Sequence, residues 1–170
     1  PVLNSDEFKR ETIVGYAATS KDIKVLENSS SGGLFALIAI EFLKDNSWVI
    51  GAKIDDNFCV KHTAINRIED LKSLQGSKYV QSNMDGIINK VCELLINGQK
   101  VLFSGTPCQV SGLKKALKVK GTNVKNLYTI DIVCHGVPSP EFFKEHMKFN
   151  YGDVTNIKFR HRTKHELNGY

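Results

Sequence analysis

The chain has 170 residues, of which 41% are hydrophobic and 24% are charged, a composition typical of a soluble domain that buries a core. The net charge is +5, but the basic residues are spread along the chain and are not interleaved with aromatic residues, which argues against nucleic-acid binding. No apolar run is long enough to span a membrane, and the mild basicity suits an anionic cofactor or an acidic partner protein.

The first half of the sequence predicts a helix between extended segments. Residues 12–19 are predicted as a first strand, and residues 21–31 as a polar linker. Residues 32–44 have apolar positions at helical spacing. Residues 48–54 and 58–65 are predicted to pair as a β-hairpin across a tight turn.

The second half alternates helices and strands, which predicts right-handed βαβ units and parallel pairing. Its expected helices are residues 68–74, 84–96, 107–119 and 138–150. Its expected strands are residues 100–104, 127–133 and 154–159. The predicted fold class is therefore α/β, with a mixed, largely parallel sheet covered by helices and a β-hairpin in the first half.

The ends of the sequence suggest a piece of a longer protein, since it begins with Pro1 and stops in a polar stretch. We expect one α/β domain over residues 1–160 and a truncated C-terminal segment at 161–170. The four cysteines, at positions 59, 92, 108 and 134, are too dispersed for a disulfide framework. They predict reduced thiols and a cytoplasmic location.

Two of these cysteines follow predicted strands directly. Cys108 lies in the first turn of a helix that Thr106 caps and Pro107 opens, where the helix dipole favours a thiolate. Cys134 follows the strand at 127–133, and His135 comes next. The carboxyl ends of parallel strands form the ligand-binding edge of α/β sheets, so the two thiols suggest a metal or redox centre. The side chain of His135 is open to three interpretations: a metal ligand, a proton donor or a hydrogen-bonded packing group.

Two further motifs suit an anionic, flat ligand. Residues 29–33 are three serines and two glycines before an apolar helix, and such a turn lets a phosphate approach the helix N-terminus. Their spacing matches neither a Walker loop nor the dinucleotide-binding glycine pattern. Residues 76–82 combine a cation, an aromatic ring and hydrogen-bonding side chains in one loop. Tyr79 could stack on a flat ring, and Lys78 could pair with a phosphate or polarise a ring nitrogen.

Taken in order, these motifs resemble the beta subunit family of the coenzyme F420-reducing hydrogenases and dehydrogenases. The segments that carry the resemblance are residues 29–35, 76–82, 101–109 and 131–140, and it extends over about positions 12–160. The resemblance implies a flavin enzyme with FAD and a 4Fe–4S cluster. Such proteins pass electrons between a redox partner protein or ferredoxin and a small-molecule hydride acceptor, either the deazaflavin coenzyme F420 or a related compound.

The resemblance also implies roles for individual residues. Cys108 and Cys134 match the cysteines expected to ligate the cluster, and Lys78 and His135 are the candidate catalytic residues. The expected cofactor-binding residues are Ser30, Ser31, Gly32, Gly33, Ser77, Lys78, Tyr79, Gln81 and Thr106. A 4Fe–4S cluster normally takes four thiolates, so the ligand set in this chain is incomplete.

Two other functions stay open from the sequence. Cys108 could be a catalytic nucleophile activated by its helix and by His135. Alternatively, the chain could be a binding module without redox function, in polysaccharide biosynthesis, because similar sequences occur near such genes.

Overall fold

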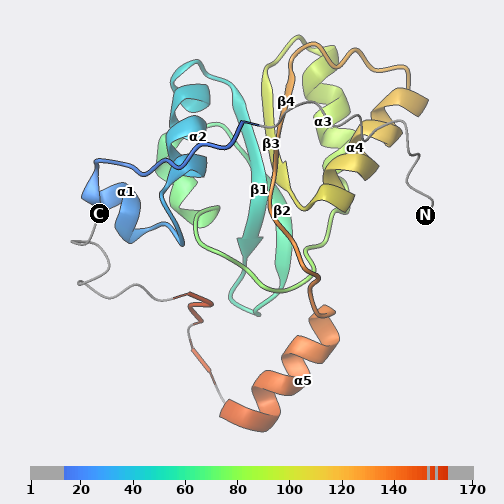
Figure 1. Ribbon diagram of the computed structural model, residues 1–170. Coiled ribbons are helices and arrows are strands. Elements are labelled where there is room, and N and C mark those ends of the chain that lie inside the picture. Colours follow the sequence, from blue (N-terminus) through green and yellow to red (C-terminus); the bar gives the residue numbers. More distant parts are fainter. Residues whose placement is uncertain (1–13, 153, 156, 161–170) are drawn as a thin grey trace.

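The computed structural model describes residues 14–152, 154–155 and 157–160. Its core is a four-stranded sheet in the order β2-β1-β3-β4, with helices on both faces (Figure 1). The elements in chain order are α1 (Ile23–Glu27), α2 (Leu34–Lys44), β1 (Trp48–Ile54), β2 (Val60–Ile65), the 3₁₀ helix η2 (Ile68–Ser73), α3 (Ile87–Ile96), β3 (Val101–Gly105), α4 (Pro107–Val119), β4 (Leu127–Asp131) and α5 (Pro140–Tyr151). None of the helices in these residues is long and apolar enough to cross a membrane.

The predicted mixed α/β sheet is confirmed. Strands β1, β3 and β4 run parallel, while β2 pairs antiparallel with β1 as the second strand of a hairpin. All of β3 is buried, which explains why it begins with three consecutive apolar residues, Val101, Leu102 and Phe103. Parallel pairing brings the carboxyl ends of β1, β3 and β4 to one edge, where β3 and β4 continue into the turns that carry Cys108 and Cys134.

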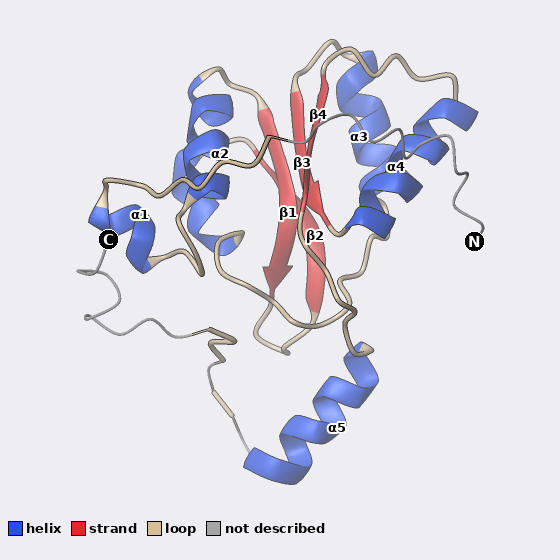
Figure 2. Ribbon diagram, viewed as in Figure 1, coloured by secondary structure: helices blue, strands red, loops and turns tan. Residues whose placement is uncertain are grey.

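Two hydrophobic clusters lie on opposite faces of the sheet, because neighbouring residues of a strand point to opposite sides. Val49 and Leu102 pack with α2 and η2, whereas Ile50 and Phe103 pack with α3 and α4. Figure 2 shows α2 on one side of the strands and α3 with α4 on the other. The result is a three-layer core that leaves the carboxyl edge of the sheet accessible.

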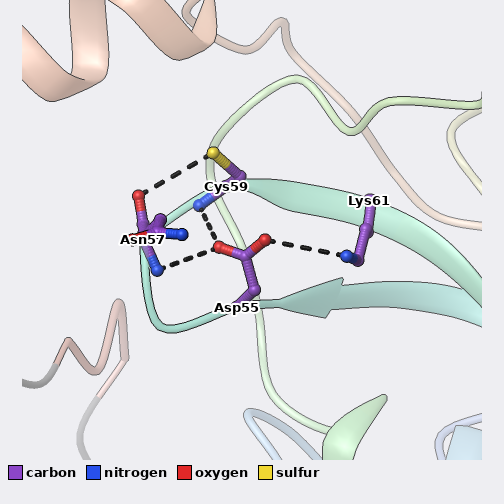
Figure 3. A network of polar contacts seen from close by, with 4 residues as sticks. All are labelled: Asp55, Asn57, Cys59 and Lys61. Atoms are coloured by element: carbon purple, nitrogen blue, oxygen red, sulfur yellow. Dashed lines mark hydrogen bonds and ion pairs between the residues drawn. The ribbon is translucent and has the colours of Figure 1, made fainter.

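The β1–β2 hairpin is closed by a turn built around Asp55 (Figure 3). Its carboxylate accepts the backbone N–H of Cys59 at 2.9 Å and that of Asn57 at 3.1 Å, and Lys61 lies 3.7 Å away. The hydrogen bond from Cys59, with that from Asn57, holds the pKa of Asp55 below its usual value. The turn explains the Asp-Asp-Asn sequence, since such residues stabilise tight turns.

Helix α5 lies beyond this hairpin, outside the two helical layers (Figure 1). It buries Phe143 in a third, smaller cluster with Val60 of β2 and Val80 of the loop at 76–82. The ring of Phe159 packs on Phe143 at 5.4 Å between centroids. This cluster connects the C-terminal helix to one wall of the ligand-binding edge.

Two predicted strands are absent from the described residues. Residues 14–19 have no regular structure, and residues 154, 155 and 157–159 form no strand. The side chains of Val14 and Tyr16 are exposed, so the alternating pattern of the first segment finds no sheet to pair with. The predicted linker at 21–31 contains α1. Residues 12, 13 and 156, and the segment 161–170 expected to be truncated, lie outside the described residues.

Candidate functional site

A cleft of about 890 Å³ opens at the carboxyl ends of the parallel strands. Its volume is in the upper part of the roughly 300–1,000 Å³ range of small-molecule sites. All four sequence motifs contribute to its walls, through residues 29–35, 76–82, 104–106 and 134–137. Every predicted cofactor-binding residue lines it: Ser30, Ser31, Gly32, Gly33, Ser77, Lys78, Tyr79, Gln81 and Thr106. The structure thus brings these residues together, while their role in binding a cofactor stays a prediction.

The loop at 76–82 connects the other walls of the cleft. The backbone N–H of Ser77 donates to the Ser30 hydroxyl at 2.7 Å, which joins the loop to the turn before α2. The N–H of Gln81 donates to the Pro138 carbonyl at 3.0 Å, which joins it to the turn before α5. A short loop tied at both ends can hold its intervening side chains toward the cleft.

The turn before α2 presents the N-terminus of that helix to the cleft. The N-cap residue is Gly33, with φ of 80° and no side-chain cap, and Gly33, Leu34 and Phe35 all line the cleft. The Ser30 hydroxyl does not cap this helix, and it accepts the N–H of Ser77 instead. Uncapped N–H groups and the positive end of the helix dipole favour an anionic ligand here.

Lys78 supplies a second positive group to the cleft. It is the one Lys, Arg, Asp or Glu among the described residues that line it. Its Nζ donates to the carbonyls of Leu74 at 2.9 Å and Gln75 at 2.8 Å, and burial lowers its pKa to about 8. The ammonium group is therefore fixed in position and partly dehydrated, which strengthens its attraction for an anion.

Tyr79 and His135 lie at exposed positions of the cleft wall. The ring of Tyr79 is half exposed and meets Phe159 edge-on at 5.9 Å between centroids. His135 follows Cys134 in the exposed turn that ends at Pro138. Both side chains remain accessible to a ligand, as the prediction of their roles requires.

His62 is a cleft residue that sequence reasoning missed. It comes from β2, is buried, and stacks on Phe103 with 5.2 Å between ring centroids. Its Nε2 lies 3.0 Å from the Ser104 carbonyl, and its Nδ1 lies 3.0 Å from the Ser82 hydroxyl. Burial lowers its pKa. The only sequence signal is a polar residue at an inward-facing position of the strand, two residues after the buried Val60.

The two predicted cluster ligands are exposed and reach the same end of the sheet. Cys134 lines the cleft, where its Sγ accepts the N–H of Gly136 at 3.3 Å. Cys108 lies in the first turn of α4, with its Sγ 3.1 Å from the Thr106 hydroxyl. Their identification as metal ligands stays a prediction.

The remaining cysteines do not complete a ligand set. Cys92 lies within α3 against the core and contacts the hydroxyl of Thr122 at 3.1 Å. Cys59 belongs to the β1–β2 turn. In the described part of the chain, no three His, Cys, Asp or Glu residues are grouped so as to hold a metal ion. These residues therefore do not fit a complete 4Fe–4S site by themselves.

Comparisons with known proteins found one family model and similar solved structures. Residues 98–169 match a family model that describes the C terminus of the beta subunit of coenzyme F420 hydrogenase/dehydrogenase. The fold is similar to that of a chain in the F420-reducing NiFe hydrogenase complex from Methanosarcina barkeri, with a TM-score of 0.65 and 19% sequence identity. The match covers 82% of this chain and 52% of that one, so this chain spans about half the length of the hydrogenase chain that it matches. No curated protein matches the chain significantly.

Proposed function

Because residues 98–169 of this chain match the family model for the C terminus of the coenzyme F420 hydrogenase/dehydrogenase beta subunit, we propose that the chain belongs to that family and is the flavin-binding part of an oxidoreductase. In this proposal it binds FAD and passes electrons between a redox partner protein, such as a ferredoxin, and a hydride acceptor. Coenzyme F420 or a related small molecule is the proposed acceptor. We expect the protein in the cytoplasm, because its four cysteines are free and reduced thiols persist there.

The observation that carries the proposal is the cleft that all four motifs share. A dinucleotide carries two phosphates, and this cleft offers a helix N-terminus and a half-buried ammonium group without any carboxylate among its described lining residues. Its location at the carboxyl ends of parallel strands is where open α/β sheets bind nucleotides.

The residues present fit FAD. The N–H groups at the start of α2, beside Ser31, Gly32 and Gly33, would hold the phosphates. The ring of Tyr79 would pack on a flat part of the ligand, and Lys78 would neutralise negative charge on a phosphate or on the reduced ring. The bound flavin would supply the hydride chemistry, while the chain holds it in place and limits its contact with water.

The 4Fe–4S cluster, unlike FAD, does not fit the residues present. Four thiolates are required, and in the described residues no three His, Cys, Asp or Glu side chains are grouped so as to hold a metal ion. We keep Cys108 and Cys134 as candidate ligands, and nothing in the proposed action of the flavin site depends on them.

Titration with FAD, followed by flavin fluorescence, tests the proposal. Wild-type protein should bind FAD, and Lys78→Met should weaken binding about tenfold because it removes a charge-assisted contact. Lys114→Met is the matched control, since Lys114 is exposed on α4. Wild-type protein that binds no FAD would contradict the proposal.

Iron content after anaerobic reconstitution tests the cluster ligands separately. Cys108→Ser and Cys134→Ser should each reduce bound iron, whereas Cys92→Ser should not, because Cys92 packs in α3. Iron binding that is insensitive to both exposed cysteines would remove them as ligands.

The nucleophile alternative receives less support from the geometry. Among the described residues, the hydrogen-bond partner of the Cys108 thiol is Thr106, and no hydrogen bond joins it to His135. A cysteine nucleophile needs a base within reach to activate it.

A further inference from the structure

A chain of side-chain hydrogen bonds lies beneath the cleft, and the donor and the acceptor of each bond can be assigned. The Ser104 carbonyl 3.0 Å from His62 Nε2 can only accept, so Nε2 carries a proton. A neutral imidazole then has an acceptor at Nδ1, to which the Ser82 hydroxyl donates a hydrogen bond at 3.0 Å. The neutral ring with its proton on Nε2 satisfies both contacts.

The same chain extends to the start of α4. Gln109 accepts the backbone N–H of Thr106 through Oε1 at 3.1 Å, which fixes the orientation of its amide. Its Nε2 therefore donates to the Ser82 hydroxyl at 2.7 Å, with a longer contact of 3.5 Å to the Ser82 carbonyl. The Ser82 oxygen can accept the hydrogen bond from Gln109 because its own hydroxyl hydrogen points toward His62.

Backbone pairing fixes the first part of this chain. His62 N–H donates to the Asn83 carbonyl, and Asn83 N–H donates to the Val60 carbonyl, both at 2.9 Å. These bonds hold Ser82 beside β2. The contact from Ser82 to α4, by contrast, depends on side-chain orientation alone.

We propose that His62 is a positioning residue of the cleft: through Ser82 and Gln109, its neutral Nε2-protonated form holds the first turn of α4 against the loop at 76–82. This turn carries Thr106 and Cys108, and the loop carries Lys78 and Tyr79. His62 therefore sets the spacing of two walls that the ligand must touch together. The inference rests on the proposed function only for the identity of the ligand.

Two amide substitutions separate positioning from packing. The amide of Asn reaches the place of Nδ1, so His62→Asn keeps an acceptor for Ser82 and loses the donor to Ser104. The amide of Gln reaches the place of Nε2, so His62→Gln keeps that donor and loses the acceptor. If His62 only filled space, the larger Gln would be the better replacement.

The binding arm uses FAD as the probe. His62→Gln and Ser82→Ala should each weaken FAD binding about tenfold, because each breaks the link from His62 through Ser82 to Gln109. His62→Asn keeps that link and should bind within about threefold of wild type. His146→Gln serves as the control, since His146 is exposed on α5. Equal losses for the Asn and Gln variants, or a smaller loss for Gln, would overturn the inference.

Two further measurements need no ligand. Nitrogen NMR of the imidazole should show the proton on Nε2, and hydrogen exchange at the Thr106 amide should accelerate in His62→Gln and Ser82→Ala but not in His62→Asn. A proton on Nδ1, or unchanged Thr106 exchange in all variants, would contradict the inference. If wild-type protein bound no FAD, the proposed function would fail, and these two measurements would still decide the role of His62.

Discussion

Lys78 shows how one residue can serve both the structure and the ligand. Its ammonium group is held by two carbonyls at the end of η2, yet burial lowers its pKa from 10.5 to about 8. The unfolded chain therefore binds more protons than the folded protein between about pH 8 and pH 10.5. Below about pH 8 the burial of this charge lowers the free energy of unfolding by its full amount. As the pH rises from about 8 to 10.5, the free energy of unfolding increases again.

The same pKa predicts how anion binding depends on pH. As the pH rises through about 8, the free protein loses the Lys78 charge, so its affinity for FAD should fall toward that of Lys78→Met. The variant should show a flat profile over the same range. Fluorescence titrations from pH 6.5 to pH 9.5 measure both curves. Parallel curves for the two proteins would mean that Lys78 does not contact the anion.

Gly32 is a second residue whose identity the structure explains. A Cβ at this position would collide with the backbone carbonyl of Ala18, whose segment is held close by the hydrogen bond from Ser20 N–H to the Gly32 carbonyl at 2.7 Å. The turn before α2 therefore needs glycine for close backbone packing, whether or not a phosphate binds there.

We expect Gly32→Ala to destabilise the protein by about 1–3 kcal/mol, the usual cost of overpacking. Gly112→Ala is the matched control, because Gly112 lies within α4 and an added Cβ meets nothing within 4 Å. That change should stabilise the protein by about 0.5–1 kcal/mol through helix propensity. Urea denaturation measures both free energies of unfolding. A neutral Gly32→Ala would show that the segment at Ala18 can move aside.

At the scale of elements, local sequence signals were sufficient to predict where a helix begins or ends when several of them agreed. Helix α4 begins as predicted, with Thr106 as N-cap and Pro107 at the first position. Helix α3 ends at Ile96, with Asn97 as its C-cap before Gly98, whose φ is 73°. The segment at 14–19 has a strand-like sequence but no strand partner in the described residues. Its conformation depends on tertiary contacts that local propensity does not contain.

The docking of helix α5 on the rest of the molecule can be tested by substitution. Phe143 is its buried anchor, 8% exposed, whereas Phe149 on the same helix is 88% exposed. Phe143→Ala should cost about 3 kcal/mol and release α5 from Val60 and Val80. Phe149→Ala should change the free energy of unfolding by less than about 0.5 kcal/mol.

Hydrogen exchange of the amides in α5, together with urea denaturation, distinguishes these outcomes. Faster exchange confined to α5 in Phe143→Ala would fit a locally docked helix. Equal behaviour of the two variants would contradict the assignment of Phe143 as the anchor.

At the scale of the whole molecule, the sequence predicted which motifs meet but not what lies beneath them. Strand order and parallel pairing were sufficient to bring the turns after β3 and β4 to one edge of the sheet. The chain from His62 to Gln109 joins residues 47 positions apart, and no local pattern marks its members. Such contacts follow from register across strands and loops, which the periodicity of single elements does not specify.

The cleft draws its walls from segments that pack on both faces of the sheet, so its ligand should stabilise the whole fold. FAD at about 100 times its dissociation constant should add about 2.7 kcal/mol to the free energy of unfolding. For a chain of this size, that gain raises the midpoint of thermal unfolding by roughly 5–11 °C. Thermal unfolding, followed by circular dichroism with and without FAD, measures the shift.

His62→Gln should show a smaller shift than His62→Asn at the same FAD concentration, since weaker binding gives less stabilisation. A shift in circular dichroism without one in the fluorescence of Trp48, which packs beside α3, would mean that the two layers unfold separately.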